Sequence, residues 1–195
     1  PAIENYLKKF KDKLMPKPND WQGKEWSGRK PGSYQWYEIQ DSVDYYKEFE
    51  KVKIIYPEIA KESRVTIDYS GIYTNNKAFI IPSDDLHLLG VLNSKIAWLF
   101  LKKTCSVLGD ADKGGRLELR TIHVSTLPIP KKRDEKIIEL VKQSITAYND
   151  ISQVKSEHEK SLIKQQIDIL DRKINQIVYK LYDLNEQEIF SVENN

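Results

Sequence analysis

Basic and aromatic side chains are interleaved between residues 24 and 37, where prolines and glycines interrupt any regular element. Cations neutralise phosphates and aromatic rings with polar tips can hydrogen-bond to them, and such contacts position a protein on a DNA duplex. The candidate DNA-contacting residues of this stretch are Lys24, Trp26, Arg29, Lys30 and Tyr37. The competing interpretation is that the aromatic rings form the core of a small sheet.

A second group of basic residues lies around the Gly114-Gly115 doublet. Lys113, Arg116 and Arg120 belong to it, and an arginine here can reach guanine in the major groove with its bidentate guanidinium. Arg64 is a further candidate for reading base edges, and Lys53 for holding a phosphate. The competing interpretation of this group is a solvated loop.

The motifs that methyl transfer and nuclease chemistry require are absent from the sequence. An adenine methyltransferase needs a Gly-rich turn for its cofactor and an Asn/Asp-Pro-Pro-aromatic loop for the flipped base, and neither occurs. Acid-x-lysine spellings at 134–136 and 171–173 fall in helical segments, which favours solvated helix faces over a nuclease site. Cys105 is the one cysteine and the three histidines are scattered. We therefore predict no catalytic, cofactor-binding or metal-binding residues in this chain.

Charge is divided unevenly along the 195 residues. The net charge is +2, but residues 1–133 hold 23 Lys/Arg against 17 Asp/Glu, net +6, and residues 134–195 hold 8 against 12, net −4. A basic segment followed by an acidic one suits a polyanion-binding module joined to a protein-facing element. The longest apolar run, 96–101, is too short to cross a bilayer, so we expect a cytoplasmic protein without a membrane partner.

Hydrophobic periodicity predicts a sheet of short strands with one packed helix. Alternation predicts a strand near 65–69, with further strands at 52–56, 78–81 and 116–119. A capping hydroxyl at Ser83 and a broad apolar stripe predict a helix to about Lys103. Pro128 and Pro130 then end this domain.

Two further helices are predicted after the prolines. Apolar residues recur at heptad spacing from Ile163 to Leu181, and the segment 136–155 offers a matching face. The predicted fold is α+β: a small twisted sheet of short strands with a packed helix, followed by a C-terminal helical hairpin. We expect a leading helix and linker at 1–20, which continues from an absent upstream domain, a recognition domain at 21–130 and a hairpin tail at 131–195.

Several strings in this order resemble one known family. They are Trp36-Tyr37-Glu38, the segment 49–59, the run DYSGIYTN from Asp68, the segment 88–95, Gly114-Gly115, Leu127-Pro128-Ile129-Pro130, and the segment 171–189. The combination of the Leu-Asn-Ser-Lys helix with the Leu-Pro-Ile-Pro exit is the most specific part. The pattern resembles the TaqI-like C-terminal specificity domain of type II, methylase-fused restriction enzymes. Gln40 departs from it, because family members commonly have arginine there, so no phosphate contact is carried over to Gln40.

The resemblance implies a target recognition domain of a bacterial restriction-modification enzyme. Such a domain clamps double-stranded DNA against an upstream methyltransferase domain of the same polypeptide, so that an adenine can be flipped into the catalytic pocket. That neighbour would bind S-adenosylmethionine, and a fused nuclease would need magnesium, whereas this fragment would be non-catalytic. Two alternatives remain open: half of a type I specificity subunit, and a helical protein-interaction module that dimerises through the heptad seam.

Overall fold

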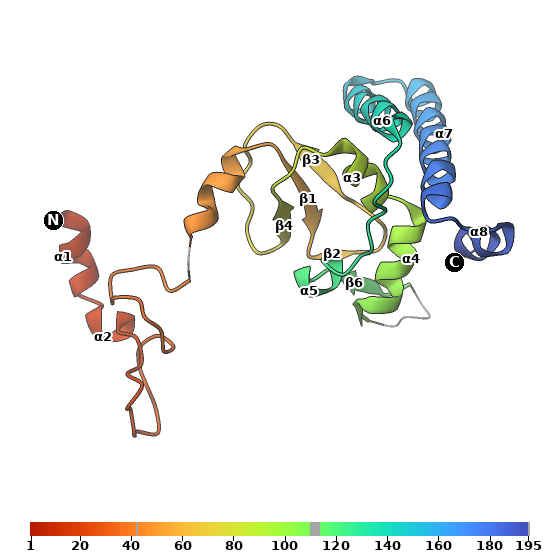
Figure 1. The fold of residues 1–195 in the computed structure, drawn as a ribbon. Helices are drawn as coiled ribbons and strands as arrows, with labels where there is room; N and C mark the ends of the chain where they lie inside the picture. The colour runs from red at the N-terminus through yellow and green to blue at the C-terminus, as the bar shows by residue number, and fades with distance from the viewer. Residues whose placement is uncertain (42, 110–113, 195) are drawn as a thin grey trace. The chain divides into compact units, whose positions relative to one another are not determined.

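The computed structural model describes residues 1–41, 43–109 and 114–194 (Figure 1). The chain forms two compact units, Pro1–Lys47 and Glu48–Asn195, and each is described by itself. The predicted domain boundaries at residues 20 and 130 remain predictions.

The first unit consists of two short helices and a long irregular segment. Helices α1 (Ala2–Lys8) and α2 (Lys11–Leu14) have no buried residues. The single leading helix predicted within residues 1–20 is thus two short helices, because the chain leaves helical geometry at Phe10, the N-cap of α2. A 3₁₀ helix, η1 (Asp44–Glu50), leads into the second unit.

The first sheet of the second unit contains the three strands that alternation predicted near 52–56, 65–69 and 78–81. Strand β1 (Lys53–Pro57) lies between β3 (Thr66–Asp68) and β4 (Ala78–Ile81), and both pairings are antiparallel. Ile54 pairs with Ile67 on one side and with Ile81 on the other. This apolar row explains why β1 is the central strand.

The second sheet is formed by strands β2 (Ile59–Ala60), β6 (Arg116–Glu118) and β5 (Ser106–Leu108). Strand β6 is central and antiparallel to both neighbours. Leu117 and Leu119 are buried with Leu101 and Cys105 in a small core of their own. Residues at alternate positions of β6 therefore face away from that core.

The single helix predicted from Ser83 to Lys103 is two helices, α3 (Leu86–Leu92) and α4 (Lys95–Thr104). Asp85, not Ser83, caps α3, and Ser94 caps α4 by accepting from the backbone N–H of Ala97. The Asn93 side chain ends α3: its Oδ1 accepts from the Val65 N–H at 3.1 Å and its Nδ2 donates to the Val65 carbonyl at 2.8 Å. The helices are separate because Asn93 pairs with an extended segment 28 residues away.

The predicted C-terminal helices pack into the core of the second unit. Helices α6 (Glu135–Gln153) and α7 (Glu157–Leu181) lie side by side, and α8 (Glu186–Glu193) follows (Figure 1). A short helix, α5 (Thr121–Val124), precedes them. The main core joins Ile54 of the first sheet and Leu89 of α3 to Ile137 of α6 and Ile174 of α7. Gly90 permits this contact, because a Cβ there would lie 2.5 Å from Ile137 Cγ2.

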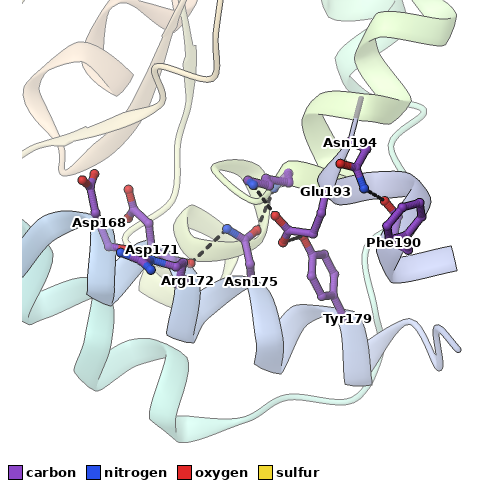
Figure 2. Close-up of polar contacts among 9 residues, drawn as sticks. Asp168, Asp171, Arg172, Asn175, Tyr179, Phe190, Glu193 and Asn194 are labelled. Carbon is purple, nitrogen blue, oxygen red and sulfur yellow. Dashed lines mark hydrogen bonds and ion pairs between the residues drawn. The ribbon is translucent and has the colours of Figure 1, made fainter. Parts of the chain in front are cut away.

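Polar contacts also connect α7 and α8 to the start of α4 (Figure 2). Asn175 Oδ1 accepts from the Lys95 N–H at 2.8 Å, and Lys95 Nζ forms an ion pair with Glu193. Tyr179 donates to Glu193 Oε1 at 2.7 Å. Burial, reinforced by Glu193, raises the pKa of Tyr179, so its phenol stays neutral and donates.

These elements confirm the predicted α+β class, with two small antiparallel sheets and a helical C-terminal region. Among the described residues, no helix combines the length and the apolar character needed to cross a membrane.

Candidate nucleic-acid interface

Arg29 shapes the irregular segment of the first unit. Its guanidinium donates hydrogen bonds of 2.8 to 3.1 Å to four backbone carbonyls, those of Leu14, Gln35, Trp36 and Glu38. It also lies over the Tyr34 ring, 4.5 Å from the centroid. Because most of its donors are occupied, Arg29 is placed to hold the loop together rather than to reach outward.

The other candidates of the first unit divide by exposure. Trp26 is half-buried, packs edge-on against Trp21 at 5.0 Å and donates to the Met15 carbonyl. Lys24 and Tyr37 are exposed, as is Lys30, whose ammonium lies 3.4 Å from an Asp41 carboxylate oxygen. Lys24, Lys30 and Tyr37 are therefore presented to solvent, and Trp26 serves the packing of its own unit.

Lys53, predicted to hold a phosphate, is fully buried in the first sheet. Its ammonium donates to the Phe49 carbonyl at 2.6 Å and forms an ion pair with Asp68, its cross-strand neighbour. An ammonium in this position is inaccessible to a phosphate of DNA. Alternation along β1 could not have indicated this, since Lys53 and the next residue, Ile54, are both buried although their side chains point to opposite faces.

Asp68 is a structural residue, and it was not among the predicted site residues. It accepts hydrogen bonds from Lys53, from the backbone and hydroxyl of Ser70, and from the backbone of Ile72. Burial alone would raise the pKa of Asp68, but these hydrogen bonds outweigh it and hold the pKa well below its usual value. The Lys53–Asp68 pair thus fixes the loop after β3, in which Gly71 has a φ of 76°.

Arg116 lies in the central strand of the second sheet, and Arg120 follows that strand at the N-cap of α5. The buried Leu117 and Leu119 alternate with Arg116, Glu118 and Arg120. Arg120 Nη2 donates to Glu118 Oε1 at 2.8 Å, whereas Arg116 is exposed and has no ion pair with any residue that the structure describes. The structure therefore brings together two of the predicted base-reading residues, with a carboxylate between them.

Arg64 and Lys113 complete the predicted set. Arg64 is exposed after β2, where its Nε and Nη2 both donate to Glu62 Oε1, at 2.9 and 2.6 Å. Asn93 holds the flanking residues Ser63 and Val65, so it fixes the segment that carries Arg64. Lys113 lies outside the described residues.

The residues considered for nucleophilic or metal chemistry have packing roles. Cys105 is buried in the core beneath the second sheet, and burial raises the pKa of its thiol. His87 is buried and its Nε2 accepts from the Asp134 N–H at 3.2 Å, which connects α3 to the start of α6. Within the described part of the chain, no group of three His, Cys, Asp or Glu side chains is placed to hold a metal ion.

Comparison with known proteins gives the family. The family model of the TaqI-like C-terminal specificity domain matches residues 4–129, a segment that includes every candidate DNA-contacting residue and ends just before Pro130. No curated protein matches the chain. Because the match covers well over half of the sequence, the chain belongs to the TaqI-like C-terminal specificity domain family.

Proposed function

We propose that this chain recognises a specific sequence in double-stranded DNA for a bacterial restriction-modification enzyme of type II. The observation that carries the proposal is the family match over residues 4–129, because a specificity domain selects a target and does not itself catalyse a reaction. The exposed row of Arg116 and Arg120 supports it. Arginine is the side chain that most often reads guanine in the major groove.

The exposed side chains fall into two proposed groups, one that contacts phosphates to position the domain and one that contacts base edges to read the sequence. Lys24, Lys30 and Tyr37 are suited to contact phosphates, which fix orientation without conveying sequence. Arg64, Arg116 and Arg120 are the proposed base-reading residues. We do not propose direct DNA contacts for Lys53, Arg29 and Trp26, because their side chains interact with residues of their own units.

We further propose that the catalytic chemistry belongs to an upstream methyltransferase domain of the same polypeptide. S-adenosylmethionine would bind to that domain, and magnesium would be needed only where a nuclease is fused to it. The described residues of this chain offer neither the Gly-rich turn nor a metal-ligand group for either cofactor.

The alternative of a module that dimerises through its heptad seam is weakened by packing. Ile167, Leu170 and Ile174 are buried, and α7 packs against α6 of the same chain. This seam is therefore occupied within the chain and is not free for a second copy.

Selection from a library of random duplexes tests the proposal directly. The purified chain should enrich one sequence motif over several rounds, and fluorescence anisotropy should show tighter binding to that motif than to a scrambled duplex. Binding should weaken as salt rises, since phosphate contacts release counterions. Enrichment of no motif would contradict the proposal.

A further inference from the structure

The carboxylate of Glu118, at the end of β6, is paired with the exposed Arg120. Arg116 and Glu118 occupy alternate positions of β6, so their side chains leave the same face of the sheet. Arg120 follows at the N-cap of α5, where its side chain returns to Glu118. The Glu118 side chain is 18% exposed, whereas that of Arg120 is 60% exposed. The arginine thus reaches outward from a carboxylate that the sheet holds in place.

A carboxylate in this position opposes nonspecific DNA binding. It repels phosphates, and it lowers the local positive potential that attracts a duplex. On DNA the Glu118 carboxylate is favourable only where it accepts a hydrogen bond from a base, because that bond compensates for its repulsion of the phosphates. The exocyclic amino group of cytosine, N4, is such a donor in the major groove.

The Glu118–Arg120 pair has both a free hydrogen-bond acceptor and free hydrogen-bond donors among the described residues. Glu118 Oε1 accepts from Arg120, and its Oε2 accepts no hydrogen bond from any described residue. Arg120 uses Nη2 for Glu118, and its Nε and Nη1 have no acceptor within the described part of the chain. The pair therefore presents an acceptor beside several donors, already oriented by a 2.8 Å hydrogen bond.

We propose that Glu118 and Arg120 together read one C·G base pair in the major groove. Glu118 accepts from cytosine N4, and Arg120 donates to O6 and N7 of the paired guanine. In the major groove the base edges of C·G present both the amino donor that Glu118 requires and the acceptors that Arg120 requires. This inference rests on the proposed function, and it adds Glu118 as a residue that determines specificity.

The test is duplex selection with the full chain and three variants. The wild-type chain should select a motif containing a C·G pair that Glu118→Ala no longer selects, while the rest of the motif persists. At that pair, discrimination should fall about tenfold in competition anisotropy. Glu118→Gln should shift the preference toward A·T, because a glutamine amide pairs with adenine N6 and N7. Glu157→Ala is the matched control, since it removes an exposed carboxylate, ion-paired to Lys160 on α7, and should leave the motif unchanged.

The outcomes separate the two proposals. If the wild-type chain selects no motif, the proposed DNA recognition fails and this inference fails with it. If the wild-type chain selects a motif and Glu118→Ala selects the same motif with equal discrimination, only the role of Glu118 is overturned. Circular dichroism of each variant shows that a changed motif comes from a folded protein.

Discussion

Each of the two small sheets carries a basic side chain hydrogen-bonded to a carboxylate, and the surroundings of the two pairs differ. In the first sheet, Lys53 and Asp68 are 0% and 6% exposed. In the second, Arg120 and Glu118 are 60% and 18% exposed. The first sheet shares its core with α3, α6 and α7, whereas Arg120 of the second pair and the neighbouring Arg116 are exposed.

The contrast between the two ion pairs shows that charge alone does not identify a DNA contact. Moving an ion pair into the interior costs desolvation free energy, so the pair persists only where both partners are satisfied, as Lys53 and Asp68 are. A pair at the surface contributes little to folding and remains available to a partner. We therefore expect substitutions of charged residues in the first sheet to lower the stability of the fold. Substitutions of charged residues in the second sheet should instead change DNA binding.

The largest effect on stability is expected from Lys53→Met. This change leaves the Asp68 carboxylate buried without its cation, which should lower the free energy of unfolding by about 3–5 kcal/mol. Urea denaturation measures it. The double variant Lys53→Met/Asp68→Asn removes both charges and should lose less. A stable Lys53→Met variant that bound DNA poorly would instead support a phosphate contact and remove the contrast between the sheets.

Gly90→Ala tests whether α6 and α7 share one tightly packed core with α3 and the first sheet. The new methyl group would lie 2.5 Å from Ile137 Cγ2 and 3.0 Å from Val141 Cγ2. Overpacking of this kind costs about 1–3 kcal/mol, offset in part by the better helix propensity of alanine. Thermal unfolding should show the loss, and the combined loss in Gly90→Ala/Ile137→Ala should be smaller than the sum of the two single losses, because Ile137→Ala removes the clashing methyl group. Equal stability of Gly90→Ala and the wild type would contradict close packing of α3 on α6.

A smaller, pH-dependent effect is expected where α3 begins. Hydrogen bonds from Arg133, at 2.7 Å, hold the pKa of Asp85 at about 2 although partial burial opposes this. The pKa in the folded state is below that of the unfolded chain, so the contribution is complete above about pH 4 and is lost as pH falls toward 2. The wild type should lose about 1–2 kcal/mol more than Asp85→Asn over this window in urea denaturation. If the free energy of unfolding changed equally with pH in the wild type and in Asp85→Asn, the ion pair of Asp85 with Arg133 would not contribute to stability.

Strands β1, β3, β4 and β6 could be predicted from sequence because they depend on local alternation, whereas the short strands β2 and β5 were not predicted. Arg116 and Glu118 are two residues apart, so a strand there must place them on one face. The break between α3 and α4 could not be predicted, since Asn93 ends α3 through Val65, which is distant in sequence. The burial of Lys53 likewise depends on Asp68 in another strand, and a lysine alone gives no sign of its partner.

The smallest effect on stability, and the clearest on binding, is expected from Arg116→Ala. Arg116 is exposed and has no ion pair among the described residues, so its removal should change the free energy of unfolding by less than about 0.5 kcal/mol. If Arg116 reads a guanine, affinity for the selected duplex should fall about tenfold, while affinity for a scrambled duplex changes little. If Arg116 contacts a phosphate, both affinities should fall together and the salt dependence should weaken by about one counterion. Anisotropy titrations at several salt concentrations distinguish these results.

Lys164→Ala, on the exposed side of α7, is the matched control, because it removes one cation from the acidic segment and should alter neither affinity. A loss of stability in Arg116→Ala as large as that in Lys53→Met would show that the second sheet, like the first, uses its basic residues for folding.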